Sequence, residues 1–76
     1  MSKAIESKIK YLAEKTHGSE NINSQDRFID LPGWDSLRHA EFIISLQKEF
    51  GIRLTPSEIA ALVSLSAAYE ILLKKT

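Results

Sequence analysis

The chain contains no cysteine among its 76 residues, which excludes disulfide bonds, thiolate metal sites and a cysteine nucleophile. Ten basic and ten acidic residues cancel, so the excess positive charge typical of nucleic-acid-binding domains is missing. No apolar run approaches the ~20 residues of a membrane-spanning helix, and the charged N-terminal segment is unlike a signal peptide. The histidines and carboxylates show no metal-ligand spacing. We therefore expect a cytoplasmic protein that has no membrane span and binds neither nucleic acid nor metal.

Glycine and proline are also scarce, with three and two residues respectively. No segment alternates apolar and polar side chains as a half-buried strand does. A chain of 76 residues is long enough for one small core. The sequence therefore predicts a single domain over residues 1–76 with an all-α fold. We expect a monomeric four-helix bundle of three main helices and one short helix, with a long first loop.

The first helix is predicted over residues 3–15, ending near Thr16 or His17 with Gly18 as its C-cap. Three apolar residues at helical spacing form its core face: Ile5, Ile9 and Leu12. Residues 18–35 then form a long connection, which in a compact domain is usually functional or held by its own apolar side chains. Four residues are candidates for that anchoring: Ile22, Phe28, Ile29 and Leu31. A short helical turn fits within this connection.

The second helix is predicted over residues 36–50, with Asp35 as N-cap and Gly51 at its end. At about 100° per residue, its large apolar side chains fall on one face. These core-facing residues are Phe42, Ile43, Leu46 and Phe50. A second apolar stripe lies nearly opposite and consists of Leu37, Ala40 and Ile44, bordered by Glu41 and Lys48. Leu37 is either buried by another element or presented to a partner, whereas Ile44 is expected to be a partly exposed docking residue.

Two further helices are predicted after an apolar connector. Thr55 and Glu58 form a capping box around Pro56, which marks the start of a short third helix. Its expected apolar contacts are Ile59, Leu62 and Val63. Ser64 is the predicted N-cap of the fourth helix, which runs to about Lys74.

The most specific pattern in the chain is Gly33-Trp34-Asp35-Ser36-Leu37. Ser36 follows turn residues and a capping aspartate, so its hydroxyl is expected on the first helical turn and exposed to solvent. A helix N-terminus favours a negatively charged group. Ser36 is therefore a candidate attachment point for an anionic group such as a phosphate.

The residue types of a hydrolytic triad are also present, as Ser36, His39 and Asp35. Three neighbours within one helical turn do not supply the oriented base, oxyanion site and substrate pocket that hydrolysis needs, so we expect no enzyme activity. His39 is predicted to be a partly buried structural residue, and His17 a cation at a helix end. Trp34 has two compatible interpretations: a cover over the end of the bundle, or an apolar wall beside the group on Ser36.

These residues, in this order, resemble the acyl carrier and peptidyl carrier protein family. The resemblance rests on residues 33–37, on residues 41–52 that close the second helix, and on the capped helix start at Thr55-Pro56. It covers almost the whole chain and implies an acyl-carrier-like domain. It also implies a 4′-phosphopantetheine arm on the Ser36 hydroxyl, transferred from coenzyme A by a phosphopantetheinyl transferase. The thiol of that arm would carry an acyl group as a thioester.

The resemblance further implies docking to acyl- or aminoacyl-loading enzymes and to downstream biosynthetic enzymes. We assign that docking surface to six residues around the serine: Trp34, Asp35, Leu37, Ala40, Glu41 and Ile44. The second helix is less acidic than in carriers of fatty acid synthesis, and Pro32 stands where those carriers have a leucine or similar residue. Both features favour a carrier of a specialised, polyketide-like or fatty-acid-like pathway.

Two other functions stay open at this point. A peptidyl or aminoacyl carrier, loaded by an adenylating enzyme, would use the same serine and arm. An unmodified helical interaction module would use only Leu37, Ala40 and Ile44. The phenylalanine and isoleucine content predicts a filled core, so the cargo is expected to be small or polar and to stay outside the bundle.

Overall fold

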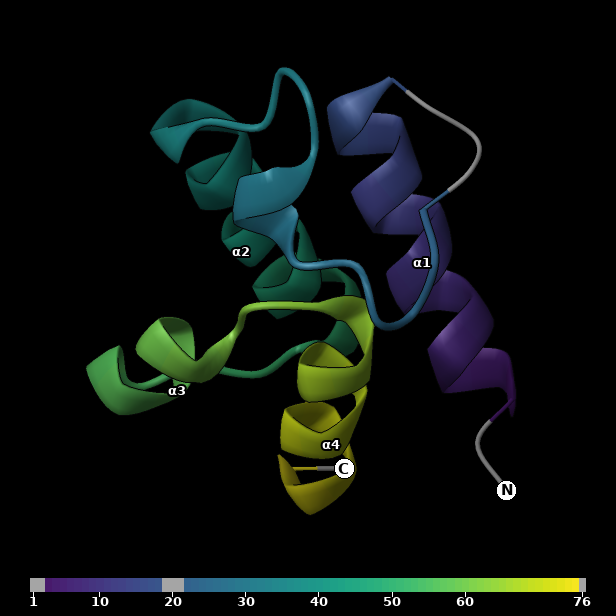
Figure 1. The fold of residues 1–76 in the computed structure, drawn as a ribbon. Helices are drawn as coiled ribbons and strands as arrows, with labels where there is room; N and C mark the ends of the chain where they lie inside the picture. Colours follow the sequence, from purple (N-terminus) through teal and green to yellow (C-terminus); the bar gives the residue numbers. More distant parts are fainter. Residues whose placement is uncertain (1–2, 19–21, 76) are drawn as a thin grey trace.

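The computed structural model describes residues 3–18 and 22–75, and this part of the chain contains four α-helices (Figure 1). They are α1 (Lys3–His17), α2 (Ser36–Phe50), α3 (Pro56–Ala61) and α4 (Leu65–Lys75), with a 3-10 turn, η1 (Phe28–Asp30), in the long first loop. The β pairing within the described residues is a single isolated bridge between Arg27 and Ser64. The predicted all-α class, helix order and loop turn are confirmed. Within the same residues, no helix has both the length and the hydropathy of a membrane span.

Both ends of α2 form as the local sequence predicts. Asp35 has an extended backbone, and its Oδ1 accepts a hydrogen bond from the Arg38 N–H at 2.9 Å. Gly51 has a φ of 62°, the left-handed conformation that glycine adopts without strain, and its N–H donates to the Gln47 carbonyl oxygen. The Asp35 cap makes Ser36 the first residue of the helix, and Gly51 ends it after Phe50.

The predicted caps of α3 and α4 are also present. The Thr55 hydroxyl accepts from the Glu58 N–H at 3.2 Å, and the Glu58 carboxylate accepts from the Thr55 N–H at 2.9 Å. This backbone hydrogen bond, together with the Lys75 ammonium at 3.0 Å, lowers the pKa of Glu58. The Ser64 hydroxyl accepts from the Ala67 N–H at 3.2 Å. A single residue, Glu58, thus caps α3 and ties it to the end of α4.

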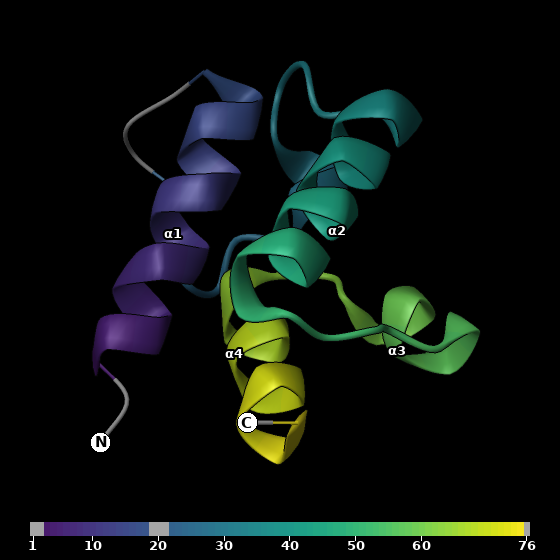
Figure 2. The same cartoon turned by 180° about the vertical axis from the view of Figure 1, so that it is seen from behind.

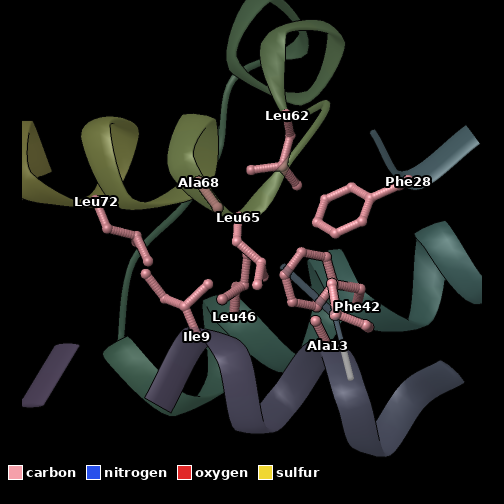
Figure 3. Packing of buried hydrophobic residues seen from close by; sticks show 10 residues of the cluster. Ile9, Ala13, Phe28, Phe42, Leu46, Leu62, Leu65, Ala68 and Leu72 are labelled. Carbon is pink, nitrogen blue, oxygen red and sulfur yellow. The ribbon is translucent and has the colours of Figure 1, made fainter. Parts of the chain in front are cut away.

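The core lies where α1 packs against both α2 and α4, while α3 projects away from α1 in both views (Figures 1 and 2). Phe28 of the loop and Leu62 after α3 point into this core from the side of the loop and α3 (Figure 3). Ten side chains form the buried cluster: Ile9, Ala13, Ile22, Phe28, Phe42, Leu46, Leu62, Leu65, Ala68 and Leu72. Burial of each large member contributes about 1.5–3 kcal/mol. By contrast, no residue of α3 itself is buried.

Some apolar residues lie differently from expectation. Ile29 was expected to anchor the loop but is 75% exposed, because η1 turns Phe28 inward and the following side chain toward solvent. Val63 was expected to contact the core but is 44% exposed. The helix ends at Ala61, and the Val63 N–H donates to the Ala61 carbonyl oxygen at 2.9 Å in a tight turn centred on Leu62. In this turn Leu62 is buried and Val63 faces out. Two of the predicted core residues of α2 are only partly buried: Ile43 and Phe50.

The burial pattern of α2 gives a stability test within one helix. Leu46 is fully buried and Ile44 is 58% exposed. Leu46→Ala should lower the free energy of unfolding by about 2–5 kcal/mol, because it leaves a cavity in the core. Ile44→Ala, the matched control, should change it by no more than about 0.5 kcal/mol. Urea unfolding followed by circular dichroism measures both values, and equal losses would contradict this placement of the core.

Candidate functional site

Ser36 opens α2 with an exposed side chain, as predicted. The preceding Asp35 turns its carboxylate back onto the helix end, where it caps the Arg38 N–H. The N-terminus of the helix adds a partial positive charge beside Ser36. The serine hydroxyl is therefore held at a fixed place on the surface, within reach of a second protein.

The turn before α2 sets the direction from which the chain enters the helix. The Trp34 N–H donates to the Leu31 carbonyl oxygen at 3.0 Å, which closes a turn around Pro32 and Gly33. Gly33 has a φ of 85°, and a proline followed by a glycine in this conformation is the pattern of a type II turn. A residue with a Cβ would be strained at this position.

Trp34 is partly buried and joins the loop to the aromatic part of the core. Its ring stacks on Phe28 with the centroids 4.6 Å apart and meets Phe42 edge-on at 5.8 Å. Its indole N–H donates to His39 Nδ1 at 3.2 Å. Each aromatic pair contributes about 0.5–1.5 kcal/mol beyond burial. Trp34 thus covers the end of the core and also forms an apolar wall next to Ser36.

His39 lies one helical turn after Ser36 and is partly buried, as expected. The indole N–H can only donate, so His39 Nδ1 must be an unprotonated acceptor, and the proton of the neutral ring resides on Nε2. Burial lowers the pKa of His39 from its ordinary value of 6.5, which favours this neutral ring. Trp34 therefore fixes the tautomer of the histidine nearest to the serine.

His17 has a contact that its position in the sequence does not reveal. Its Nε2 is hydrogen-bonded to the Pro32 carbonyl oxygen, and its ring centroid lies 6.0 Å from that of Trp34. His17 lies in the last turn of α1, as expected, but it also has a second role, because α1 ends against the turn that precedes α2. The bond joins residues 15 positions apart, so only the packing of α1 creates it.

An open groove of about 630 Å³ begins at Ser36. Loop residues such as Phe28 form one side, α2 contributes His39 and Ile43, and α3 contributes Ile59. The groove was not predicted, because it forms only where α3 lies beside the loop and α2. No local sequence pattern indicates that placement. An apolar surface therefore adjoins the serine.

The second apolar stripe of α2 faces solvent. Leu37 is 60% exposed and Ile44 is 58% exposed. Ala40 and Glu41 between them are exposed as well. Leu37 was expected either to be buried by another element or to face a partner. The described residues do not bury it. An apolar row on the outer side of α2 starts one residue after Ser36.

The family described as "Phosphopantetheine attachment site" matches residues 9–72, a range that includes all of α2, α3 and the loop before them. The chain belongs to this family. Its cofactor is 4′-phosphopantetheine, the group for which the family is named. Members of such carrier families are generally not catalysts.

The chain is also similar to a protein whose name is more specific than that of the family. Over 41 residues the chain is 42% identical to "Polyketide-8 synthase acyl carrier protein 2" of Streptomyces avermitilis. The matched segment covers 54% of this chain and 47% of that protein. The chain therefore spans about half the length of the curated relative it matches.

The surroundings of Ser36 fit a phosphopantetheine arm. The exposed hydroxyl would accept the phosphate, and the helix N-terminus provides a favourable field for its charge. The adjoining groove, with Phe28 and Ile43 in its lining, offers an apolar surface for the arm. When bound, the arm supplies the thiol that a cysteine-free chain lacks.

Trp34 is the single tryptophan of the chain, so its fluorescence reports the bond to His39. Protonation of Nδ1 removes the acceptor and places a quenching imidazolium beside the indole. Because burial lowers the pKa of His39, the fluorescence should fall with a midpoint below pH 6.5. The unfolded chain takes up this proton at higher pH than the folded chain. Folding stability should therefore decrease as the pH falls from 6.5 toward that midpoint.

His39→Asn is the matched control for this titration, because an asparagine Oδ1 can accept the indole bond but does not titrate. Its fluorescence should not show the transition. His17→Gln tests the other histidine, whose ring also lies 6.0 Å from Trp34. A transition that persists in His39→Asn and disappears in His17→Gln would show that the wrong histidine has been assigned.

Proposed function

We propose that the chain is a carrier protein whose Ser36 holds the 4′-phosphopantetheine arm. The observation that supports this most directly is the exposed Ser36 hydroxyl at the start of α2, within the region matched by the family and beside an apolar groove. Residues 1–76 would act as one acyl-carrier-like domain and as a monomer. The proposed compartment is the cytoplasm, whose reducing conditions fit a chain without cysteine.

Attachment of the arm requires only an accessible hydroxyl from this chain. The Ser36 oxygen forms a bond to the pantetheine-bearing phosphorus of coenzyme A, the bond from that phosphorus to the adenosine-side phosphate breaks, and the hydroxyl proton passes to a base of the transferase. Asp35 is not suited to be that base, because its carboxylate is engaged by the Arg38 N–H at 2.9 Å. Asp35 instead keeps the helix start, and so the serine, in place.

The same hydrogen bonds argue against a hydrolytic role. A serine triad needs a histidine whose Nδ1–H is held by a carboxylate and whose other nitrogen contacts the serine. Here His39 Nδ1 accepts from Trp34, and Asp35 caps the helix. We therefore propose that the chain is not an enzyme and that it presents intermediates to enzymes.

The proposed pathway is a specialised one, of polyketide or fatty-acid-like type. The similarity to a carrier named as part of a polyketide synthase supports this assignment. The charge of α2 supports it too, since Arg38 and Lys48 offset Glu41 and Glu49. Glu49 is moreover paired with a lysine of α1 at 2.8 Å. Partner enzymes would recognise this helix more by apolar contact than by charge.

The proposed docking surface is the outer side of α2 together with the residues before Ser36. It consists of Trp34, Asp35, Leu37, Ala40, Glu41 and Ile44. Leu37 and Ile44 are its anchors, because large exposed apolar side chains next to a functional group mark protein contacts. The expected partners are a phosphopantetheinyl transferase, an acyl-loading enzyme and downstream biosynthetic enzymes.

Incubation with coenzyme A and a broad-specificity phosphopantetheinyl transferase should increase the intact mass of the wild-type protein by one arm. Ser36→Ala should gain nothing. Ser57→Ala is the matched control, because Ser57 is also an exposed serine in the first turn of a capped helix, and it should be modified as the wild type is.

An adduct that persists in Ser36→Ala would refute the assignment of the serine. A wild-type protein that gains no mass, while a known carrier does, would refute the carrier function and leave the unmodified interaction module. If the arm accepts an amino acid from an adenylating enzyme and no acyl group, the aminoacyl alternative holds instead.

Ile44→Asp should slow modification by the transferase, because it places a charge in the proposed apolar contact. We expect kcat/KM to fall at least about tenfold, which corresponds to about 1.4 kcal/mol. Leu73→Asp is the control, because Leu73 is an exposed apolar residue of α4, 43% accessible, outside the proposed surface. Circular dichroism checks that both variants stay folded. Equal kcat/KM values in the two variants would remove Ile44 from the docking surface.

A further inference from the structure

His39 carries a hydrogen-bond donor that neither the fold nor the attachment of the arm uses. Its Nδ1 accepts from the Trp34 indole at 3.2 Å, so the neutral ring has its proton on Nε2. Among the described residues, the one buried side-chain nitrogen or oxygen without a partner is His17 Nδ1. His39 Nε2 also has no partner in that part of the chain, and it is not one of its fully buried atoms. His39 thus presents a free N–H in a fixed tautomer.

This donor lies beside the serine. Residues three positions apart on a helix are surface neighbours, which places His39 next to Ser36. Both residues line the groove that begins at the serine. The Trp34 ring also contacts the imidazole, in a T-shaped arrangement with the two ring centroids 6.0 Å apart. The ring cannot turn away from the serine without losing both this contact and the hydrogen bond.

We propose that His39 is a binding residue for the phosphopantetheine arm, and that its Nε2–H donates a hydrogen bond to an oxygen of the phosphodiester on Ser36. This role rests on the proposed attachment at Ser36. A hydrogen bond to an anionic oxygen is shorter and stronger than one between neutral groups. It directs the first part of the arm along the groove. Trp34 is then a positioning residue, because it acts through His39.

Few charged groups of the fold face His39. Asp35, on the same helix, has its carboxylate in the helix cap, and Arg27 of the loop lines the same groove. From α1, His17 lies against the Trp34 ring, and α3 contributes only uncharged residues to the groove. The phosphodiester is therefore the main new charge that His39 meets on modification. An adjacent anion favours the imidazolium and should raise the pKa of His39 above its value in the unmodified protein.

Phosphorus NMR of the modified protein tests this contact directly. A phosphodiester keeps one negative charge across the range in which histidine titrates, so its resonance responds to pH only through a titrating neighbour. We expect the phosphorus resonance to shift between about pH 8 and about pH 5. Its midpoint should coincide with that of the His39 ring resonances. The His39 midpoint should also lie higher in the modified wild type than in Ser36→Ala.

Two substitutions of His39 separate the roles of its nitrogens. His39→Asn keeps an acceptor for the Trp34 indole but removes the distal donor, so the pH response should vanish. His39→Gln places an amide N–H near the position of Nε2 and should restore the wild-type phosphorus shift seen at high pH, without a titration.

Trp34→Phe keeps the ring stacking, leaves Nδ1 without its donor and should weaken the response. His17→Gln should leave the response unchanged.

The role of His39 is overturned if the phosphorus resonance does not move with pH and the His39 midpoint equals that of Ser36→Ala. It is likewise overturned if the pH response survives in His39→Asn. In either case a mass adduct on Ser36 would leave the carrier function intact. A protein that acquires no adduct would instead refute the attachment itself, so the two failures are distinguishable.

Discussion

Phe28 joins the long first loop to the core, and the position of Ser36, the proposed attachment residue, depends on that contact. Its ring is 2% exposed, stacks on Trp34 at 4.6 Å and meets Phe42 at 5.1 Å. Its backbone N–H donates to the Val63 carbonyl oxygen at 2.9 Å. The loop, α2 and the segment between α3 and α4 therefore meet at one residue, through its ring and its backbone N–H. Loss of the Phe28 ring would remove the stacking partner of Trp34, which stands two residues before Ser36.

The helices could be predicted from the sequence because their signals are local. A cap depends on residues within one turn, so Asp35, Thr55 and Ser64 identify three helix starts without knowledge of the packing. The core stripe of α2 follows from its period in the same way. Phe28 and Ile29 could not be told apart, because a single 3-10 turn has too few residues to show a period. Only the packed loop decides which of the two side chains turns inward.

The candidate site likewise combines local features that the sequence predicts with contacts that only the packing creates. The exposed serine at a helix start and the exposed stripe after it follow from the sequence, since both lie on one helix. The bond from Trp34 to His39 spans five residues across a turn, and the bond from His17 to Pro32 spans 15. Such pairs depend on where α1 and the turn lie in space. The groove requires α3 as well, so residues from three segments had to be placed before it could be recognised.

The segments that line the groove beside Ser36 are buried to different extents. On the loop side, Arg27 forms the bridge to Ser64, and the Phe28 N–H donates to the Val63 carbonyl oxygen at 2.9 Å. The other side is formed by α3, a helix of six residues, none of which is buried. A segment with so few buried contacts opens at a lower free energy than the rest of the bundle. The groove can therefore widen at α3 and narrow again, while the capped start of α2, with Ser36, keeps its position.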